Sequence, residues 1–382
     1  MSEVKLKAET DYYEIVRQKL TLGHYTLPKH EKITELMKIF WDEETIKLLS
    51  YFPDAGEIIS PNEIAEKSGI PRKEVKKLLK QAAEKRTIAK VGRNFSLHTL
   101  LPGVFEAYFI AQKDTPENLK AAAKIYRFLF EGRDEIQTSS VSKPLFSPLL
   151  PYETSEKLIK IDEGVDIQSV VLPYQLVEEL INRNEHFAVI PCQCRLIAEL
   201  DEESESCKLV PAEDGCFLAG IRAEAIARLG MGRALTKEEA IEYIKKTEKA
   251  GLVHNASFDT NSNRFFICNC CPCHCGVIGS TKKFGSLSQH KSNFAPKSND
   301  EICVRCKTCL KKCPMEVITY SEADDKMEIN YDSCIGCGLC ASNCPKNAIL
   351  MERVRDEIPP ERNVIAKGKT FGDMVSEILL GQ

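Results

Sequence analysis

The sequence has no run of about 18 apolar residues, which is the length that a membrane-spanning helix needs. Its start, MSEVKLKAETDYYEIV, lacks the apolar core of a secretory signal peptide. It contains no complete dinucleotide fingerprint, no phosphate-binding P-loop and no flavin motif. From these absences we expect a cytoplasmic protein without a membrane span, and any hydride chemistry would take place on a partner.

A large charge excess of either sign is lacking, because 52 Lys and Arg stand against 56 Asp and Glu. This balance excludes a partner held by overall charge and leaves only local patches. Tryptophan is almost absent, and we expect the single Trp41 to lie in a core. A chain of 382 residues is expected to hold two or three domains.

Cysteine is missing from residues 1–191 and 345–382, yet 17 cysteines lie between Cys192 and Cys344. An odd number of closely spaced cysteines without a signal peptide favours metal ligation in a reducing compartment over disulfides. The chain therefore divides into a metal-free N-terminal half and a metal-binding C-terminal half.

Residues 1–135 are predicted to form a mainly helical domain. The segment 34–97 shows three helical patterns followed by a hairpin, and Ser60-Pro61-Asn62-Glu63 has the form of a helix capping box. Gly92-Arg93-Asn94 is the predicted hairpin turn. This order of elements resembles a winged helix, a shape that many transcription regulators use.

Basic residues crowd the segment from Arg72 to Arg93, where nine Lys and Arg face only two Glu. A helix that enters a DNA groove needs such charge for phosphate contacts. A solvated helix face, or a surface that docks a protein, has the same composition. No base-reading residue stands out, so nucleic acid is not the favoured partner.

Two segments carry weaker signals. Residues 136–172, rich in Ser and Pro around 138–151, are expected to be a linker or loop. Residues 353–382 are expected to be a tail in which Phe371–Leu380 forms an amphipathic helix.

Residues 173–290 are predicted to be a central α/β domain rich in cysteine. Two short apolar runs, 186–191 and 264–267, each lead into a burst of cysteines, so both bursts should lie at strand ends. Thr236 and Glu239 cap a helix that Gly251 ends. The candidate metal ligands of this domain are Cys192, Cys194, Cys207, Cys216, Cys268, Cys270, Cys271, Cys273 and Cys275.

These nine cysteines are expected to hold one or two further iron–sulfur clusters, with zinc as the alternative. A simple partition places the first four in one site and four of the rest in another, but ligands from the two bursts could equally be mixed. The adjacent Cys270 and Cys271 do not easily bind one cube, since neighbouring side chains diverge. Arg195 follows Cys194 and could donate to cluster sulfide.

The C-terminal cysteines form two copies of the pattern C-x2-C-x2-C-x3-C-P, each of which ends in a cysteine followed by proline. This is the run of bacterial ferredoxins, in which the fourth cysteine crosses to the other cluster. Residues 296–352 are therefore predicted to be a ferredoxin-like domain with two [4Fe-4S] clusters. One cluster takes Cys303, Cys306, Cys309 and Cys344, here called the Cys303 set. The other takes Cys334, Cys337, Cys340 and Cys313, here called the Cys334 set.

The two copies differ at corresponding positions. Gly336 and Gly338 in the second copy are expected to let the backbone approach the cluster closely. The first copy has Arg305 and Lys307 there, with Lys311 and Lys312 nearby. We expect unequal potentials, with the cluster of the Cys303 set more easily reduced and an acidic partner beside it.

The segment 173–351 resembles a family of ferredoxin-type proteins found widely in anaerobic bacteria and archaea. The shared motifs are C-x-C-R at 192–195, Cys207 with Cys216, G-[LM]-G-R at 230–233, E-A-G-L-V as EKAGLV at 248–253, C-N-C-C-x-C-x-C at 268–275, and the two cubane motifs. His274 departs from the cysteine that is common at that place. The resemblance implies [4Fe-4S] binding and electron transfer without naming a substrate.

The whole chain is thus predicted to be an α+β multidomain protein that relays low-potential electrons to or from a larger oxidoreductase. Two alternatives remain. One is a regulator in which a winged helix reads DNA and clusters sense the redox state. The other is an enzyme with a catalytic cluster in the central domain, where Cys270, Cys271 or His274 would serve the chemistry.

Overall fold

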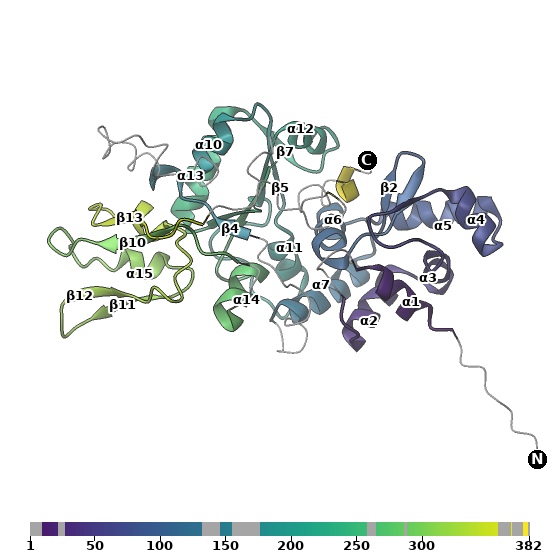
Figure 1. Ribbon diagram of the computed structural model, residues 1–382, viewed down its shortest axis with the longest axis horizontal. Coiled ribbons are helices and arrows are strands. Elements are labelled where there is room, and N and C mark those ends of the chain that lie inside the picture. The colour runs from purple at the N-terminus through teal and green to yellow at the C-terminus, as the bar shows by residue number, and fades with distance from the viewer. Residues whose placement is uncertain are drawn as a thin grey trace, which may run out of the picture.

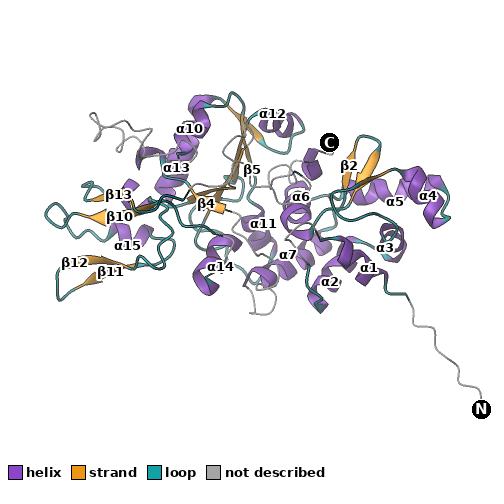
Figure 2. Cartoon of the chain, in the orientation of Figure 1, coloured by secondary structure: helices purple, strands orange, loops and turns teal. Residues whose placement is uncertain are grey.

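The computed structural model describes residues 10–21, 27–131, 146–154, 176–257, 265–285, 289–357, 368 and 377–380. The molecule is elongated, with the N-terminal helices at one end, the ferredoxin-type strands at the other and a sheet between them (Figure 1). Helices and strands are mixed throughout, as the α+β prediction requires (Figure 2). Among the described residues, no helix is long and apolar enough to cross a membrane.

The N-terminal region begins with helices α1 (Tyr12–Lys19), α2 (Glu31–Phe40) and α3 (Glu43–Leu49). Strand β1 (Ile58–Ile59) leads to α4 (Pro61–Ser68) and α5 (Arg72–Glu84), and the hairpin β2 (Ala89–Val91) and β3 (Asn94–Ser96) follows. The strands form one small antiparallel sheet in the order β1-β3-β2. The predicted capping box at Ser60 and Glu63 is present, and Gly69 ends α4 in the left-handed conformation that glycine adopts easily.

Trp41 lies in the core of this region, as predicted, and its indole N–H donates to the Thr87 hydroxyl at 3.0 Å. After a short π-helix (Leu100–Val104) come α6 (Phe105–Ala111) and α7 (Pro116–Glu131). Helix α7 packs against α2 on one side and against α11 (Gln193–Leu200) and α14 (Gly276–Phe284) on the other. It therefore connects the N-terminal core to the cysteine-rich region.

The central sheet has six strands in the order β4-β8-β9-β6-β5-β7, and every neighbouring pair is antiparallel. Its strands are β4 (Phe146–Pro148), β5 (Phe187–Ile190), β6 (Cys216–Ala219), β7 (Arg233–Leu235), β8 (Val253–Ser257) and β9 (Phe265–Cys270). The region is therefore not the α/β arrangement that the sequence suggested, because no two adjacent strands are parallel. Strand β4 lies within the segment expected to be a linker, where Pro148 is tolerated because the strand forms the edge of the sheet.

Three further helices accompany the sheet: α10 (Val177–Asn182), α12 (Ile221–Arg228) and α13 (Lys237–Ala250). Helix α13 has the predicted capping box at Thr236 and Glu239, and Gly251 ends it. Two motif glycines thus have structural roles. A Cβ on Gly232 would lie 2.9 Å from the Val189 carbonyl oxygen, and Gly251 has φ of +98°.

The C-terminal region pairs β10 (Phe294–Ser298) with β13 (Ile349–Arg353), and β11 (Ile318–Ser321) with β12 (Lys326–Ile329). The short helices α15 (Thr308–Lys312) and α16 (Leu339–Ser342) begin within the two cubane motifs. The tail returns to the N-terminal half, where Ile378 and Leu379 are fully buried (Figure 1). Residues 371–376 of the predicted tail helix lie outside the described residues.

Candidate metal centres

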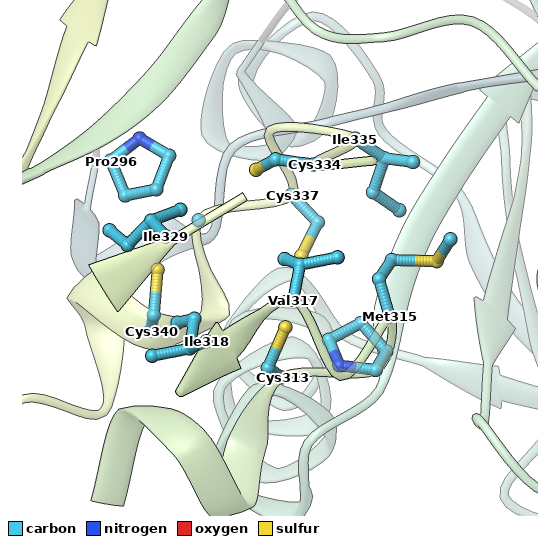
Figure 3. A pocket seen from close by; sticks show the side chains of 12 residues that line it. Pro296, Cys313, Met315, Val317, Ile318, Ile329, Cys334, Ile335, Cys337 and Cys340 are labelled. Carbon is cyan, nitrogen blue, oxygen red and sulfur yellow. The ribbon is translucent and has the colours of Figure 1, made fainter. Parts of the chain in front are cut away.

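The Cys334 set comes together around one small cavity, into which the thiols of its four cysteines point (Figure 3). The rest of the lining is mostly apolar and includes Ile318, Ile329 and Ile335. Burial raises the pKa of the Cys337 thiol to about 12, and burial also raises the pKa of the Cys334 and Cys340 thiols. The cavity therefore offers four soft ligands in an apolar surround, which suits an iron–sulfur cluster.

The Cys303 set also comes together, because Cys303, Cys306 and Cys344 all act on the Cys309 thiol electrostatically. This set is more open than the Cys334 set, and Cys306 is exposed. A hydrogen bond with the Thr308 hydroxyl lowers the pKa of the Cys306 thiol. Ile302 and Val304, on either side of Cys303, are 47% and 56% exposed.

The backbone of the two motifs is alike, although the residues differ. Gly336 and Gly338 have φ of +71° and +73°, and Arg305 and Lys307 have φ of +54° and +60° at the corresponding positions. A Cβ on Gly336 would lie 2.1 Å from the Phe294 carbonyl oxygen, and one on Gly338 would lie 2.7 Å from Pro151. Close packing on other parts of the chain therefore requires these glycines, whereas the sequence suggested an approach of the backbone to the cluster.

The side chains of the first motif face outward. Arg305 lies 3.4 Å from a carboxylate oxygen of Asp325, and the Lys307 ammonium lies 3.9 Å from the centre of the Tyr320 ring. Lys311 is exposed. Lys312 instead turns toward the central region, where it donates to the Lys249 carbonyl at 2.6 Å.

Six of the nine central thiols gather at one end of the central sheet. Ile190 pairs with Cys216, and Phe217 pairs with Ile267, so the end of β5, the start of β6 and the end of β9 are neighbours. Side chains two positions apart on a strand share a face, which places Cys268 and Cys270 together. Helices α11 and α14 begin directly after Cys192 and Cys275.

The pKa values of these six thiols are linked in a closed circle, because each thiol is affected by the side chains of two of the others. We call it the six-thiol ring, and its order is Cys192, Cys194, Cys275, Cys270, Cys268 and Cys216. Its members are buried or half-buried. Hydrogen bonds from Cys194 and Cys216 hold the pKa of the Cys192 thiol well below its usual range, and those from Cys268 and Cys275 lower that of Cys270 to about 7.

The positive charge needed beside such thiolates is built into the fold. Cys192 and Cys275 are the N-cap residues of α11 and α14, so the positive ends of two helix dipoles lie at the ring. Arg195 is fully buried, and its guanidinium donates to the Asn269 and Asp214 carbonyls. Burial alone would lower the pKa of Arg195, but the thiolates of Cys192 and its neighbours outweigh this effect and leave it raised.

The Nε of Arg195 is buried without a hydrogen-bond partner in the described structure. A buried cation with an unpaired donor is costly unless an anion stands beside it. A thiolate-bound cluster supplies that anion. The six soft ligands, the unpaired Nε and the two helix ends together fit an anionic iron–sulfur cluster in the ring.

The remaining central thiols form a second group, which we call the three-thiol site: Cys207, Cys271 and Cys273. Their sulfur atoms all lie within 4.8 Å of one another. Cys270 and Cys271 thus belong to different groups. The grouping mixes the two bursts and differs from the simple partition by sequence order, because Cys207 lies beside Cys271 and Cys273.

Sequence reasoning did not find the polar residues behind the ring. The Asn269 side chain contacts His254 Nδ1 at 2.6 Å and donates to the Gly215 carbonyl at 2.8 Å. His254 in turn lies 3.2 Å from the Glu248 carboxylate. The sequence offered one signal: Asn269 lies between Cys268 and Cys270 in an apolar run. Because alternate residues of a strand face opposite sides, its side chain should point away from those two thiols. His274 contributes its backbone N–H, which donates to the Cys271 sulfur at 3.4 Å.

The ferredoxin-type region packs directly on the region of the ring. Cys270 and Cys275 of the ring belong to the same buried cluster as Cys309 and Cys340. Leu150, Val253, Ile278 and Leu339 are fully buried members of that cluster. The Asn343 side chain also donates to the Glu248 carbonyl at 3.4 Å.

Comparison with known proteins agrees with the C-terminal geometry. A family model described as a 4Fe-4S dicluster domain matches residues 302–348, which contain all eight cysteines of the two cubane motifs. No curated protein and no solved structure matches the chain. The C-terminal region is therefore a ferredoxin-type iron–sulfur region with the capacity for electron transfer.

Proposed function

We propose that this protein is an iron–sulfur electron carrier that connects a redox partner at its surface to a cluster buried in its central region. The observation that carries the proposal is the unequal exposure of the thiol sets and their contact with the ring. Cys306 of the Cys303 set is exposed, whereas the cysteines of the Cys334 set are buried or half-buried. The six-thiol ring shares a buried cluster with Cys309 and Cys340, one cysteine from each set.

The Cys303 and Cys334 sets would each hold a [4Fe-4S] cluster, as a dicluster domain does, and the six-thiol ring would hold a further iron–sulfur cluster. Such clusters supply one-electron redox chemistry when bound. The chain supplies the thiolates, surrounds the Cys334 set with mostly apolar side chains and places Arg195 beside the ring. Because no flavin or nucleotide motif is present, we infer that the substrate is transformed on a partner, a larger oxidoreductase.

The partner would dock beside the Cys303 set. Exposed apolar side chains of Ile302 and Val304 lie there next to the exposed cations of Lys307 and Lys311. An apolar centre with a charged rim is typical of a docking surface, and its positive charge favours an acidic partner.

A variant of the buried set tests the proposal. Cys337→Ser removes a ligand of the Cys334 set, so an external protein donor should no longer reduce the cluster of the ring. A small diffusible redox dye should still reduce it. The measurement is stopped-flow reduction under anaerobic conditions, followed by EPR of the ring signal. If the protein donor reduces the ring equally fast in the variant, the proposed direction of transfer is wrong.

A second candidate function is regulation through the N-terminal region, whose order of helices and strands supports a winged-helix-like fold. Seven of the nine predicted basic residues are exposed: Arg72, Lys73, Lys76, Lys77, Lys80, Lys90 and Arg93. Lys85 instead pairs with Asp114 at 3.0 Å, and Arg86 is half-buried. Binding to duplex DNA measured against salt, in both redox states, tests this function; no salt-dependent binding in either state would remove it.

A further inference from the structure

We propose that Cys207, Cys271 and Cys273 bind a single Zn²⁺ ion, separate from the iron–sulfur sites, with its fourth coordination position open to solvent. This proposal goes beyond electron transfer and does not depend on what the six-thiol ring holds. It rests on the spacing of the three sulfur atoms, on the groups around them and on the exposure of Cys273.

The spacing of the sulfurs fits one ion. Two thiolates bound to a tetrahedral zinc at about 2.3 Å place their sulfur atoms roughly 3.8 Å apart. The Cys207 and Cys273 sulfurs are 3.5 Å apart, and all three sulfurs lie within 4.8 Å of one another. A small outward movement of the side chains would admit the ion.

The other thiol sets do not have this spacing. In the described part of the chain, this is the one group of three or more potential His, Cys, Asp or Glu ligands with such close mutual distances. The Cys303 and Cys334 sets, which lie in the dicluster domain, contain no such triple. Thiolates of a cubane bind different irons and therefore stand farther apart than thiolates that share an ion. The six-thiol ring is like the cubane sets in this respect, since no three of its sulfurs lie within 4.8 Å of one another.

Hydrogen-bond donors and positive charges lie around the three-thiol site. The backbone N–H groups of Leu209 and Val210 face the Cys207 sulfur, and the His274 N–H donates to Cys271. Arg195, with its unpaired Nε, acts electrostatically on both Cys207 and Cys271. Lys208 adds a positive charge near Cys273. These contacts offset part of the negative charge of three thiolates on a divalent ion.

The fourth position is open because the described part of the chain places no fourth ligand there. Among the described residues, no further His, Cys, Asp or Glu atom joins the group, and Cys273 is exposed. Closed structural zinc sites have four protein ligands, whereas sites with three leave a position for water or a substrate. We therefore assign the open-position class, with water as the fourth ligand.

The test compares two variants of the full-length protein, purified without oxygen. Cys207→Ser/Cys273→Ser changes only the three-thiol site, and Cys194→Ser changes only the six-thiol ring. Zinc and iron are counted per chain by elemental analysis, and the iron–sulfur signals are followed by EPR. Reconstitution with Co²⁺ then reports the coordination through its visible absorption, which is intense for tetrahedral sulfur ligation.

We expect the double variant to lose one zinc per chain, and the cobalt absorption with it, while its iron content and EPR signals stay at the wild-type level. The Cys194→Ser variant should keep zinc and change the iron signals instead. Loss of iron and an altered cluster EPR signal in the double variant would overturn the proposal, as would a wild-type protein that binds neither zinc nor cobalt. A ring without iron would refute the proposed electron path but leave the zinc result unchanged.

Discussion

The two cubane motifs have the same cysteine spacing and the same left-handed backbone positions, yet their surroundings are opposite. The first motif carries Arg305 and Lys307 at those positions and faces solvent. The second carries Gly336 and Gly338, because the Phe294 carbonyl and Pro151 leave no room for a side chain. The motif therefore determines how a cluster is held, and the packing around it determines whether the cluster meets a partner or the interior.

We expect the largest difference in iron content and thermal stability when one cysteine ligand is removed from each motif. Cys337→Ser places a polar group in the buried Cys334 cavity, so we expect loss of that cluster and of the packing around it. Cys306→Ser changes an exposed ligand and should affect the Cys303 cluster alone. Iron content and anaerobic thermal unfolding measure both variants. Equal loss of stability in the two variants would contradict the comparison.

The glycines offer a matched pair. Gly336→Ala drives a Cβ into the Phe294 carbonyl oxygen, which should destabilise the C-terminal region by about 3 kcal/mol. Arg305→Ala keeps the same backbone angle and removes a half-buried side chain that donates to backbone carbonyls of Asp300 and Asp325, so it should cost less, about 1 kcal/mol. Chemical denaturation without oxygen compares the stability of the two variants. A Gly336→Ala protein as stable as wild type would show that β10 moves to admit the added Cβ at little cost in free energy.

A buried cation should matter more than an exposed one. Arg195→Met removes positive charge beside the six-thiol ring and should lower the reduction potential of its cluster, by about 60 mV for each 1.4 kcal/mol of lost interaction. Arg195→Lys should restore part of this potential. Redox titration followed by EPR measures the shift. An unchanged potential in a fully loaded Arg195→Met protein would exclude this role.

The smallest effect is expected at the surface. Lys307→Glu lies beside the Cys303 set but is solvated, so the potential should change by only a few tens of mV at most. Reduction by an acidic protein donor should slow severalfold at low ionic strength, and the difference should shrink as salt is added. A rate that is independent of salt in both proteins would place the docking surface elsewhere.

The sequence predicted what depends on neighbours in the chain. The cubane ligands, the capping boxes at Ser60 and Thr236, and the hairpin after Val91 follow from residues a few positions apart. The grouping of the central thiols depends on strand pairing between distant segments, such as Ile190 with Cys216. The spacing of the cysteines along the sequence does not indicate which strands pair. Strand β4 was missed because its three residues, Phe146–Pro148, are too short for a pattern and contain a proline.

The electron path from surface to interior rests most directly on the unequal exposure of the two cubane clusters. EPR power saturation, measured with a soluble paramagnetic relaxing ion, reports this exposure for each cluster. The signal that disappears in Cys306→Ser identifies the Cys303 cluster, and the one that disappears in Cys337→Ser identifies the Cys334 cluster. We predict strong relaxation enhancement for the first and little for the second. Equal enhancement of both signals would contradict an outer cluster that meets the partner and an inner one that leads to the six-thiol ring.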